Sequence, residues 1–256
     1  MPAETVVRLT SWEQLQAAAG DDAFVRYDVG PAFAGGWAVD GAVAFVRPTP
    51  SRRRSLALLG AAPGVAVLLS SLAADPEVLG GRRPTAVSLP VELEPLLHQH
   101  FRAMGGADWE WFWTTAAPSF VPGEQDLTVL DNGADAEELA AFLAEVSPSA
   151  SARPGDAGNE RWVGVRDDGG ALVACGAMQR TVGGSPHLAG IAVRPDRRGE
   201  GLGAAVTAAL TRRALALDGV CTLAMYSDNA VARSLYLRLG YRVGHAWATR
   251  VIQLLG

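Results

Sequence analysis

The chain has 256 residues and a formal net charge of −5, and 49% of its residues are apolar while 19% are charged. This composition is typical of a packed globular protein and excludes a disordered chain, a collagen and a long coiled coil. The length allows one large domain or two small ones, and the negative charge argues against nucleic acid as a partner.

The two cysteines, Cys175 and Cys221, lie in apolar segments without metal-ligand spacing. They indicate neither a disulfide framework nor a zinc site, so we expect no metal. The first residues contain no positive region followed by an apolar stretch, and we therefore expect no signal peptide. A reducing, cytoplasmic location is the resulting prediction, with the chain a monomer or a homodimer.

Residues 1–125 are predicted to form a first domain of short strands and two helices. Residues 55–74 are an uncharged run of nearly bilayer-spanning length, but Pro63 and two glycines interrupt it. We therefore expect a strand, a glycine turn and a helix there, and no membrane partner. Further strands are expected near residues 24–29, 37–39, 43–46, 86–89 and 109–114.

The last of these strands carries Trp109, Trp111 and Trp113 at alternate positions, so the three indoles share one face. Aromatic side chains at this spacing are typical of a core, and a shelf for a substrate is the alternative. The turn-rich stretch 117–124 then ends the first domain.

Residues 126–256 are predicted to form a second domain of mixed α/β class, with a central twisted and mostly antiparallel sheet flanked by helices. A loop rich in Ser, Pro and Gly, 147–158, is of a kind that often covers a site. The other elements are strand 127–130, helix 135–146, hairpin 161–180, strand 187–193, helix 201–217, strand 221–227, helix 230–239 and a final strand.

An anion site is indicated where strand 187–193 runs through an arginine-rich loop into helix 201–217. Glycines at 199, 201 and 203 allow a tight backbone curl that presents N–H groups, and the helix N-terminus adds a partial positive charge. Arg197 and Arg198 can add contacts to phosphate, and the alternative is a glycine turn with solvated arginines. A dinucleotide fingerprint fits formally but lacks its βαβ context, and a Walker A loop requires a lysine, which the chain lacks.

Two motifs in order resemble those of the GNAT family of N-acetyltransferases. The first reads V-x-P-x-x-R-G-x-G-L-G and is carried by Val193, Pro195, Arg198, Gly199, Gly201, Leu202 and Gly203. The second reads N-x-x-A-x-x-L-Y-x-x-x-G-Y and is carried by Asn229, Ala232, Leu235, Tyr236, Gly240 and Tyr241. The resemblance covers residues 127 to about 252, and it implies the acyl-CoA N-acyltransferase fold with acetyl-CoA as co-substrate.

The resemblance also implies roles for individual residues. Tyr236 would protonate the coenzyme A thiolate, and His187 is a candidate base, with Glu160 and an ordered water chain as rivals. The implied coenzyme A contacts are Ile191, Ala192, Val193, Arg198, Gly199, Glu200, Gly201, Leu202, Gly203, Ala204, Asn229, Ala232 and Tyr236.

The function expected from this resemblance is transfer of an acetyl group to a primary amine of a small molecule or an amino-acid-like acceptor. The alternatives are a non-catalytic acyl-CoA-sensing or interaction module and transfer of a longer acyl group. The first half has a GNAT-like rhythm but no R-x-x-G-x-G motif. We expect it to be a degenerate, structural GNAT-like domain that helps form the acceptor pocket without binding coenzyme A.

Overall fold

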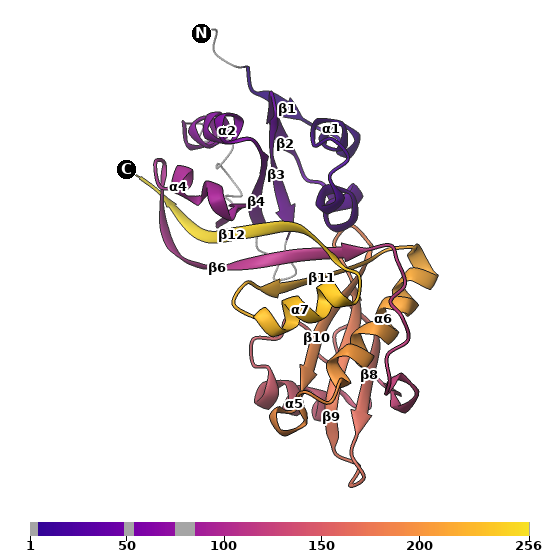
Figure 1. Cartoon of the computed structure of the whole chain (residues 1–256). Helices are drawn as coiled ribbons and strands as arrows, with labels where there is room; N and C mark the ends of the chain where they lie inside the picture. The colour runs from indigo at the N-terminus through magenta and orange to yellow at the C-terminus, as the bar shows by residue number, and fades with distance from the viewer. Residues whose placement is uncertain (1–4, 49–53, 75–84, 256) are drawn as a thin grey trace.

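The computed structural model describes residues 5–48, 54–74 and 85–255, and it contains one sheet of twelve strands with helices on both faces (Figure 1). The strand order is β1-β2-β3-β4-β5-β12-β6-β11-β10-β9-β8-β7. The pairs β4–β5 and β10–β11 are parallel and the other neighbours are antiparallel, as expected for a mostly antiparallel mixed sheet. No helix in these described ranges is long and apolar enough to cross a membrane.

The strands are β1 (Val7–Leu9), β2 (Gly36–Val39), β3 (Ala42–Pro48), β4 (Arg54–Gly60), β5 (Ala86–Pro90), β6 (Phe101–Thr114), β7 (Thr128–Leu130), β8 (Asn159–Arg166), β9 (Leu172–Arg180), β10 (Pro186–Val193), β11 (Cys221–Tyr226) and β12 (Arg242–Leu254). The helices are α1 (Trp12–Ala18), α2 (Ala62–Ala74), α4 (Glu94–Leu97), α5 (Ala136–Val146), α6 (Leu202–Asp218) and α7 (Ala230–Arg238).

Two long strands join the halves of the chain at the centre of the sheet. β12 comes from the end of the sequence, yet it lies between β5 and β6, which both belong to the first half. β6 in turn pairs with β11 of the second half. Figure 1 shows β6 and β12 crossing the middle of the molecule side by side.

The uncharged run 55–74 folds as expected for a core segment. It forms β4 and α2, and the apolar side chains that α2 buries include Val65, Leu68 and Leu72. At Gly64 an added Cβ would lie 2.7 Å from the Cβ of Ala42, so the chain's own β2–β3 hairpin fills this end of the helix.

The strand predicted at residues 24–29 is wrong, because this segment forms a π-helical turn, η1 (Val25–Val29). The Asp22 carboxylate accepts a hydrogen bond from the Val25 N–H at 3.0 Å, and its carbonyl accepts from the Arg26 N–H at 3.0 Å. The buried side chains of Val25 and Val29 are four residues apart, which is a helical spacing. An apolar run alone does not distinguish this turn from a strand.

The elements of the second half agree closely with those predicted. α6 and α7 end where glycines adopt positive φ, at Gly219 (+70°) and Gly240 (+87°). α5 packs on one face of the sheet with Trp162 and Cys175, and α6 and α7 cover the other face. These two cores hold β10 and β11 between them.

Candidate functional site

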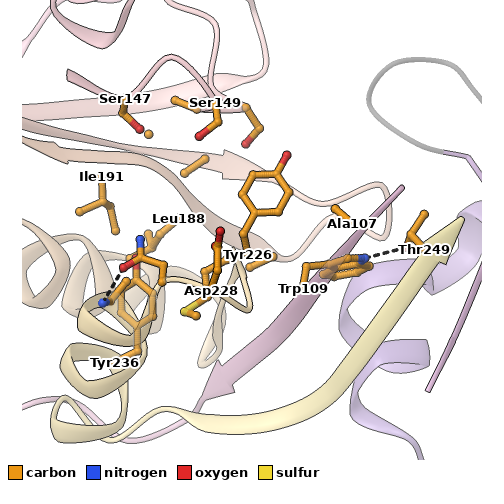
Figure 2. Close-up of a pocket in the computed structure, with 18 residues that line it drawn as sticks. Ala107, Trp109, Ser147, Ser149, Leu188, Ile191, Tyr226, Asp228, Tyr236 and Thr249 are labelled. Carbon is orange, nitrogen blue, oxygen red and sulfur yellow. Dashed lines mark hydrogen bonds between the residues drawn. The ribbon is translucent and has the colours of Figure 1, made fainter. Parts of the chain in front are cut away.

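A cavity of about 700 Å³ lies where β10 and β11 separate. These parallel strands pair at two positions, His187 with Thr222 and Leu188 with Leu223. Beyond that point both strands line the cavity, which Figure 2 shows. Its lining residues are Ala107, Trp109, Ser147, Ser149, Ala150, Ser151, Leu188, Ala189, Gly190, Ile191, Ala224, Met225, Tyr226, Asp228, Asn229, Ala232, Tyr236 and Thr249.

A β-bulge in β10 shapes the cavity wall. The pairing with β9 shifts register between Ala189 and Ala192, and Gly190 adopts a φ of +61°. An added Cβ at Gly190 would lie 2.9 Å from the Cβ of Ala152, so glycine is needed for both its conformation and its packing.

Three residues of β10, Ile191, Ala192 and Val193, are predicted to contact coenzyme A, and their backbone N–H groups differ in direction. The N–H of Arg194 donates to the Val173 carbonyl of β9 at 2.9 Å. Because amide direction alternates along a regular strand, the Ala192 N–H also points toward β9, whereas that of Val193 points toward the side of β11. Ile191 belongs to the bulge, where this alternation is interrupted, and it lines the cavity.

The N-terminus of α6 lies beside the end of β10 and presents unpaired backbone amides. Ala205 is the first residue whose N–H bonds back into this helix, to the Gly201 carbonyl at 3.0 Å. The preceding amides of the first turn have no intrahelical acceptor and carry the positive end of the helix dipole. This is the geometry of an anion site.

The glycines of this loop differ in what surrounds them. Gly199 and Gly201 both have a φ of +85°, and an added Cβ at either position would meet no atom within 4 Å. At Gly203 a Cβ would contact the side chains of Val193 and Leu235 at 3.5 and 3.7 Å. Gly199 and Gly201 thus border open space where a phosphate can approach, and Gly203 faces the protein.

The loop arginines are not equivalent either. Arg194 pairs with Asp167 and Asp196, and Arg197 pairs with Glu200 at 2.8 Å. Arg198 donates its Nε–H to the Val193 carbonyl at 3.3 Å, and no ion pair is recorded for it in the described part of the chain. Arg198 is thus the guanidinium best placed for a phosphate, whereas the Glu200 side chain is engaged by Arg197.

α7 supplies a second wall of the cavity. Asn229 caps the helix, its Oδ1 accepting from the Ala232 N–H at 3.0 Å, so its amide nitrogen stays available to the cavity. Ala232 and Tyr236 follow on the same side, as their spacing predicts. Arg233 is instead tied to Glu110 of β6 at 2.9 Å.

The Tyr236 ring is held firmly while its hydroxyl reaches the cavity. The residue is 7% exposed, and its ring lies 5.8 Å from that of Phe112 and 6.0 Å from that of Tyr241, centroid to centroid. Burial raises the pKa of the Tyr236 phenol to about 12, so the phenol stays protonated at neutral pH.

His187 and Glu160, the two candidate bases, do not line this cavity. His187 Nδ1 lies 3.0 Å from Thr222 Oγ1, and burial lowers the pKa of the imidazole, with opposing effects from Asp28 and Arg47. The side chain is therefore neutral at pH 7. Glu160 pairs with Arg180 at 2.7 Å on the protein surface.

Neither cysteine has the character of a nucleophile. Cys175 and Cys221 are fully buried, and desolvation raises the pKa of each thiol to about 12. Both pack in apolar cores, in agreement with the apolar segments that carry them in the sequence.

The sequence predicts that loop 147–158 covers a site and offers a substrate shelf as the alternative for the strand of Trp109, but it does not predict the positions of Tyr226 and Thr249. Tyr226 of β11 pairs in register with Trp109 of β6, and both line the cavity with Thr249 of β12. Among the three tryptophans, Trp111 is completely buried in the core, whereas Trp109 borders both the core and the cavity. The serines of loop 147–158 complete the wall. Strand alternation would have placed Trp109 on one face, but no local signal relates it to Thr249.

Comparison with known proteins identifies part of the chain. Residues 130–241 match the model of the acetyltransferase (GNAT) family. This segment is a GNAT acetyltransferase domain. No match was found among curated proteins.

Solved structures resemble the chain over nearly its whole length. A GCN5-related N-acetyltransferase from Sphaerobacter thermophilus has a TM-score of 0.59 at 16% identity, covering 99% of this chain and 96% of its own. A GNAT-family acetyltransferase from Colwellia psychrerythraea has a TM-score of 0.56 at 15% identity, with coverages of 97% and 100%. A GCN5-related N-acetyltransferase from Kribbella flavida gives 0.52 at 18% identity, with 95% of each chain covered. These similarities show the fold, and together with the family they indicate acyl-CoA-dependent acyl transfer.

Proposed function

We propose that the protein transfers an acetyl group from acetyl-CoA to a primary amine of a small molecule by direct attack. The observation that carries the proposal is the cavity between the separating strands β10 and β11, because Tyr236 of α7 and Ile191 of β10 both line it. In this arrangement a thioester would lie between a hydrogen-bond donor for its oxygen and a proton donor for its sulfur.

The residues present fit coenzyme A at the loop before α6. The first-turn amides of α6, the open space at Gly199 and Gly201, and Arg198 would hold the pyrophosphate. From there the outward edge of β10 leads into the cavity, so the Ile191 and Val193 amides would hold the pantetheine arm. Ile191 lines the cavity, and its N–H would polarise the thioester carbonyl.

The reaction needs no covalent enzyme intermediate. The amine nitrogen forms a bond to the carbonyl carbon, and the Ile191 N–H stabilises the oxyanion that results. The carbon–sulfur bond then breaks with the electron pair on sulfur, the Tyr236 hydroxyl donates to the thiolate, and the nitrogen loses its extra proton. Because His187 does not line the cavity, it would accept that proton only through water, and an ordered water chain is the alternative.

The first half, residues 1–125, has a structural role in this proposal. Gly64 of α2 packs against Ala42 of the chain's own hairpin, and the segment 60–64 at the start of this helix carries no arginine, which supports a half that does not bind coenzyme A. β6 of the same half supplies Trp109 and Ala107 to the cavity, which supports a contribution to the acceptor pocket.

Thiol release from acetyl-CoA in the presence of a panel of amines, with mass spectrometry of the products, tests the proposal. We expect release of free coenzyme A that depends on the amine, together with an N-acetylated product. Tight binding of acetyl-CoA by calorimetry without thiol release on any amine would contradict it and support an acyl-CoA-sensing module.

Transfer of a longer acyl group is a second candidate, because small side chains border the thioester position. Ala189, Gly190 and Ala224 all line the cavity there. Assays of acetyl-, propionyl- and butyryl-CoA with one amine decide between acetyl transfer and transfer of a longer acyl group. A kcat/KM that rises with acyl chain length would show that the longer group is the preferred donor.

A further inference from the structure

A chain of hydrogen bonds runs from the cavity into the first half of the protein. Trp109 Nε1 lies 2.7 Å from Thr249 Oγ1, and this oxygen lies 2.7 Å from Ser88 Oγ. Ser88 Oγ lies 3.3 Å from Ser55 Oγ, which donates to the Ala86 carbonyl at 3.5 Å. Trp109 and Thr249 line the cavity, whereas Ser55 and Ser88 are only 4% exposed.

The two ends of this chain favour one direction for its hydrogen bonds, although in each of the two hydroxyl–hydroxyl contacts either oxygen can donate. An indole N–H only donates and a carbonyl only accepts. All the contacts are used at once when Trp109 donates to Thr249, Thr249 to Ser88, Ser88 to Ser55, and Ser55 to the carbonyl. Buried hydroxyls favour this arrangement, because an unmade hydrogen bond there costs free energy. In this arrangement Thr249 Oγ1 keeps one free lone pair and no free hydrogen, and Thr249 lines the cavity.

The cavity lining carries no cation, and its one carboxylate, Asp228, forms no ion pair among the described residues. None of the lining residues, all of which belong to the described part of the chain, carries a guanidinium or an imidazole. Arg47 packs over the Trp109 ring, 5.9 Å from its centroid, and is paired with Asp28. Arg250, next to Thr249, is paired with Glu94 and Asp108. A carboxylate on a ligand would find no free cation here, and the lone pair of Thr249 would repel it.

Thr249 lies at the far end of the cavity from the reacting atoms. Figure 2 shows Tyr236 at one end and Thr249 beside Trp109 at the other, with Tyr226 and Asp228 between them. An amine that reacts next to Tyr236 would therefore direct the opposite end of its molecule toward Thr249, along the aromatic side chains of Tyr226 and Trp109.

We propose that the acceptor is a primary amine with a second hydrogen-bond donor, a hydroxyl or an ammonium, at its far end and no carboxylate there. This inference rests on the proposed function. Thr249 accepts the hydrogen bond of that donor and so determines specificity. Ser88 is a positioning residue, because it engages the Thr249 hydrogen and keeps the lone pair free to accept a hydrogen bond.

Four amines that differ only at the far end test this class of acceptor: an α,ω-diaminoalkane, the ω-amino alcohol, the n-alkylamine and the ω-amino acid of the same length. Each is assayed over a range of spacer lengths with acetyl-CoA. We expect the best diamine or amino alcohol to exceed the alkylamine by about 10-fold or more in kcat/KM, mainly through the KM for the amine. The ω-amino acid should be the poorest acceptor.

Variants test the assignment to Thr249. Thr249→Val should reduce the ratio of diamine to alkylamine activity to near one, and Thr249→Ser should restore it. Ser88→Ala frees the Thr249 hydroxyl to donate, so it should narrow the gap between the diamine and the ω-amino acid. Thr128→Val is the matched control, because Thr128 lies in the distant strand β7 and donates to the Gly164 carbonyl. Thermal melts of all four variants show whether they fold.

The possible failures are distinguishable. If the alkylamine is acetylated but the diamine and amino alcohol have no advantage, or if Thr249→Val preserves their advantage in a folded protein, this inference is wrong and the proposed function stands. A preferred ω-amino acid would also overturn it. If no amine releases coenzyme A although acetyl-CoA binds, the proposed function fails and this inference fails with it.

Discussion

Replacing Tyr236 by phenylalanine should reduce turnover while leaving folding and coenzyme A affinity nearly intact. The ring contacts with Phe112 and Tyr241, at 5.8 and 6.0 Å, do not involve the hydroxyl and persist in the variant. No protein partner is recorded for this hydroxyl among the described residues, so its removal breaks no hydrogen bond that stabilises the fold. Only its contact with the leaving sulfur is lost.

The pKa of Tyr236 determines the size of the expected effect. At about 12 this phenol is a weaker acid than an ordinary thiol, whose pKa is about 8.5. Complete proton transfer to the thiolate is therefore uphill, and a hydrogen bond to the developing charge provides most of the stabilisation. A hydrogen bond to a charged group contributes about 1.5–3 kcal/mol, so kcat should fall about 10- to 100-fold. If binding of the thioester lowers this pKa, the loss extends toward the roughly 10⁴-fold limit of general acid catalysis.

Steady-state kinetics with a saturating amine measure kcat, and calorimetry measures the affinity for coenzyme A on the same preparation. Tyr241→Phe is the matched control, because the Tyr241 hydroxyl contacts Thr211 Oγ1 at 2.7 Å and Cys221 Sγ at 3.0 Å in the core. It should lower the melting temperature and leave kcat nearly unchanged. An unchanged kcat in Tyr236→Phe would remove this residue from the mechanism.

Two further predictions concern the proposed phosphate site at Gly199 and Gly201 and the partly buried His187. Gly201→Ala and Gly219→Ala at the two ends of α6 replace glycines of positive φ, so both should lose about 1–2 kcal/mol of stability, but only Gly201→Ala should weaken coenzyme A binding by calorimetry. Equal affinities would refute the phosphate site. Because the pKa of His187 is lowered in the folded protein, the unfolded chain binds more protons below pH 6.5, and stability should fall as the pH drops through that value. Melting curves should show that His187→Gln loses less stability than the wild type when the pH drops through 6.5. An identical loss would show that protonation of His187 does not cause it.

Local pattern was sufficient to predict the second half of the chain. Its helices have apolar faces at helical spacing and end at glycines such as Gly219, whose left-handed conformation is expected at a helix C-terminus. The glycine loop before α6 is also local, because three glycines and a helix start follow one strand. Its backbone geometry could be predicted because residues near in sequence determine it, and coenzyme A binding there stays a prediction.

The acceptor end of the cavity is different, because its residues are distant in sequence. Trp109 and Thr249 are 140 residues apart and meet only because β12 pairs with β6. Which strand inserts beside β6 depends on the competition among all exposed strand edges, which a hydrophobic pattern does not encode. The segment 24–29 shows the same limit, since the Asp22 cap favoured a helical turn in an apolar run.

The strand order bears on the domain boundary that the sequence predicts near residue 125, because it indicates whether each half can fold alone. β12 carries no catalytic motif, yet both strands that flank it, β5 and β6, belong to residues 1–125. A fragment of residues 126–256 would keep both GNAT motifs but would expose the edge of β11 and leave β12 without either neighbour. Unpaired strand edges and the apolar face around Trp247 would then be open to solvent, which favours aggregation.

We therefore expect the fragment 126–256 to be unfolded or aggregated when expressed alone. Coexpression with residues 1–125 should restore a soluble complex, because each half provides strands that complete the sheet of the other. Circular dichroism, size-exclusion chromatography and calorimetry with coenzyme A measure the outcome. A fragment that unfolds cooperatively and binds coenzyme A with the affinity of the whole chain would show that the second half is independent, and that the central pairing of β6 with β12 contributes little to its stability.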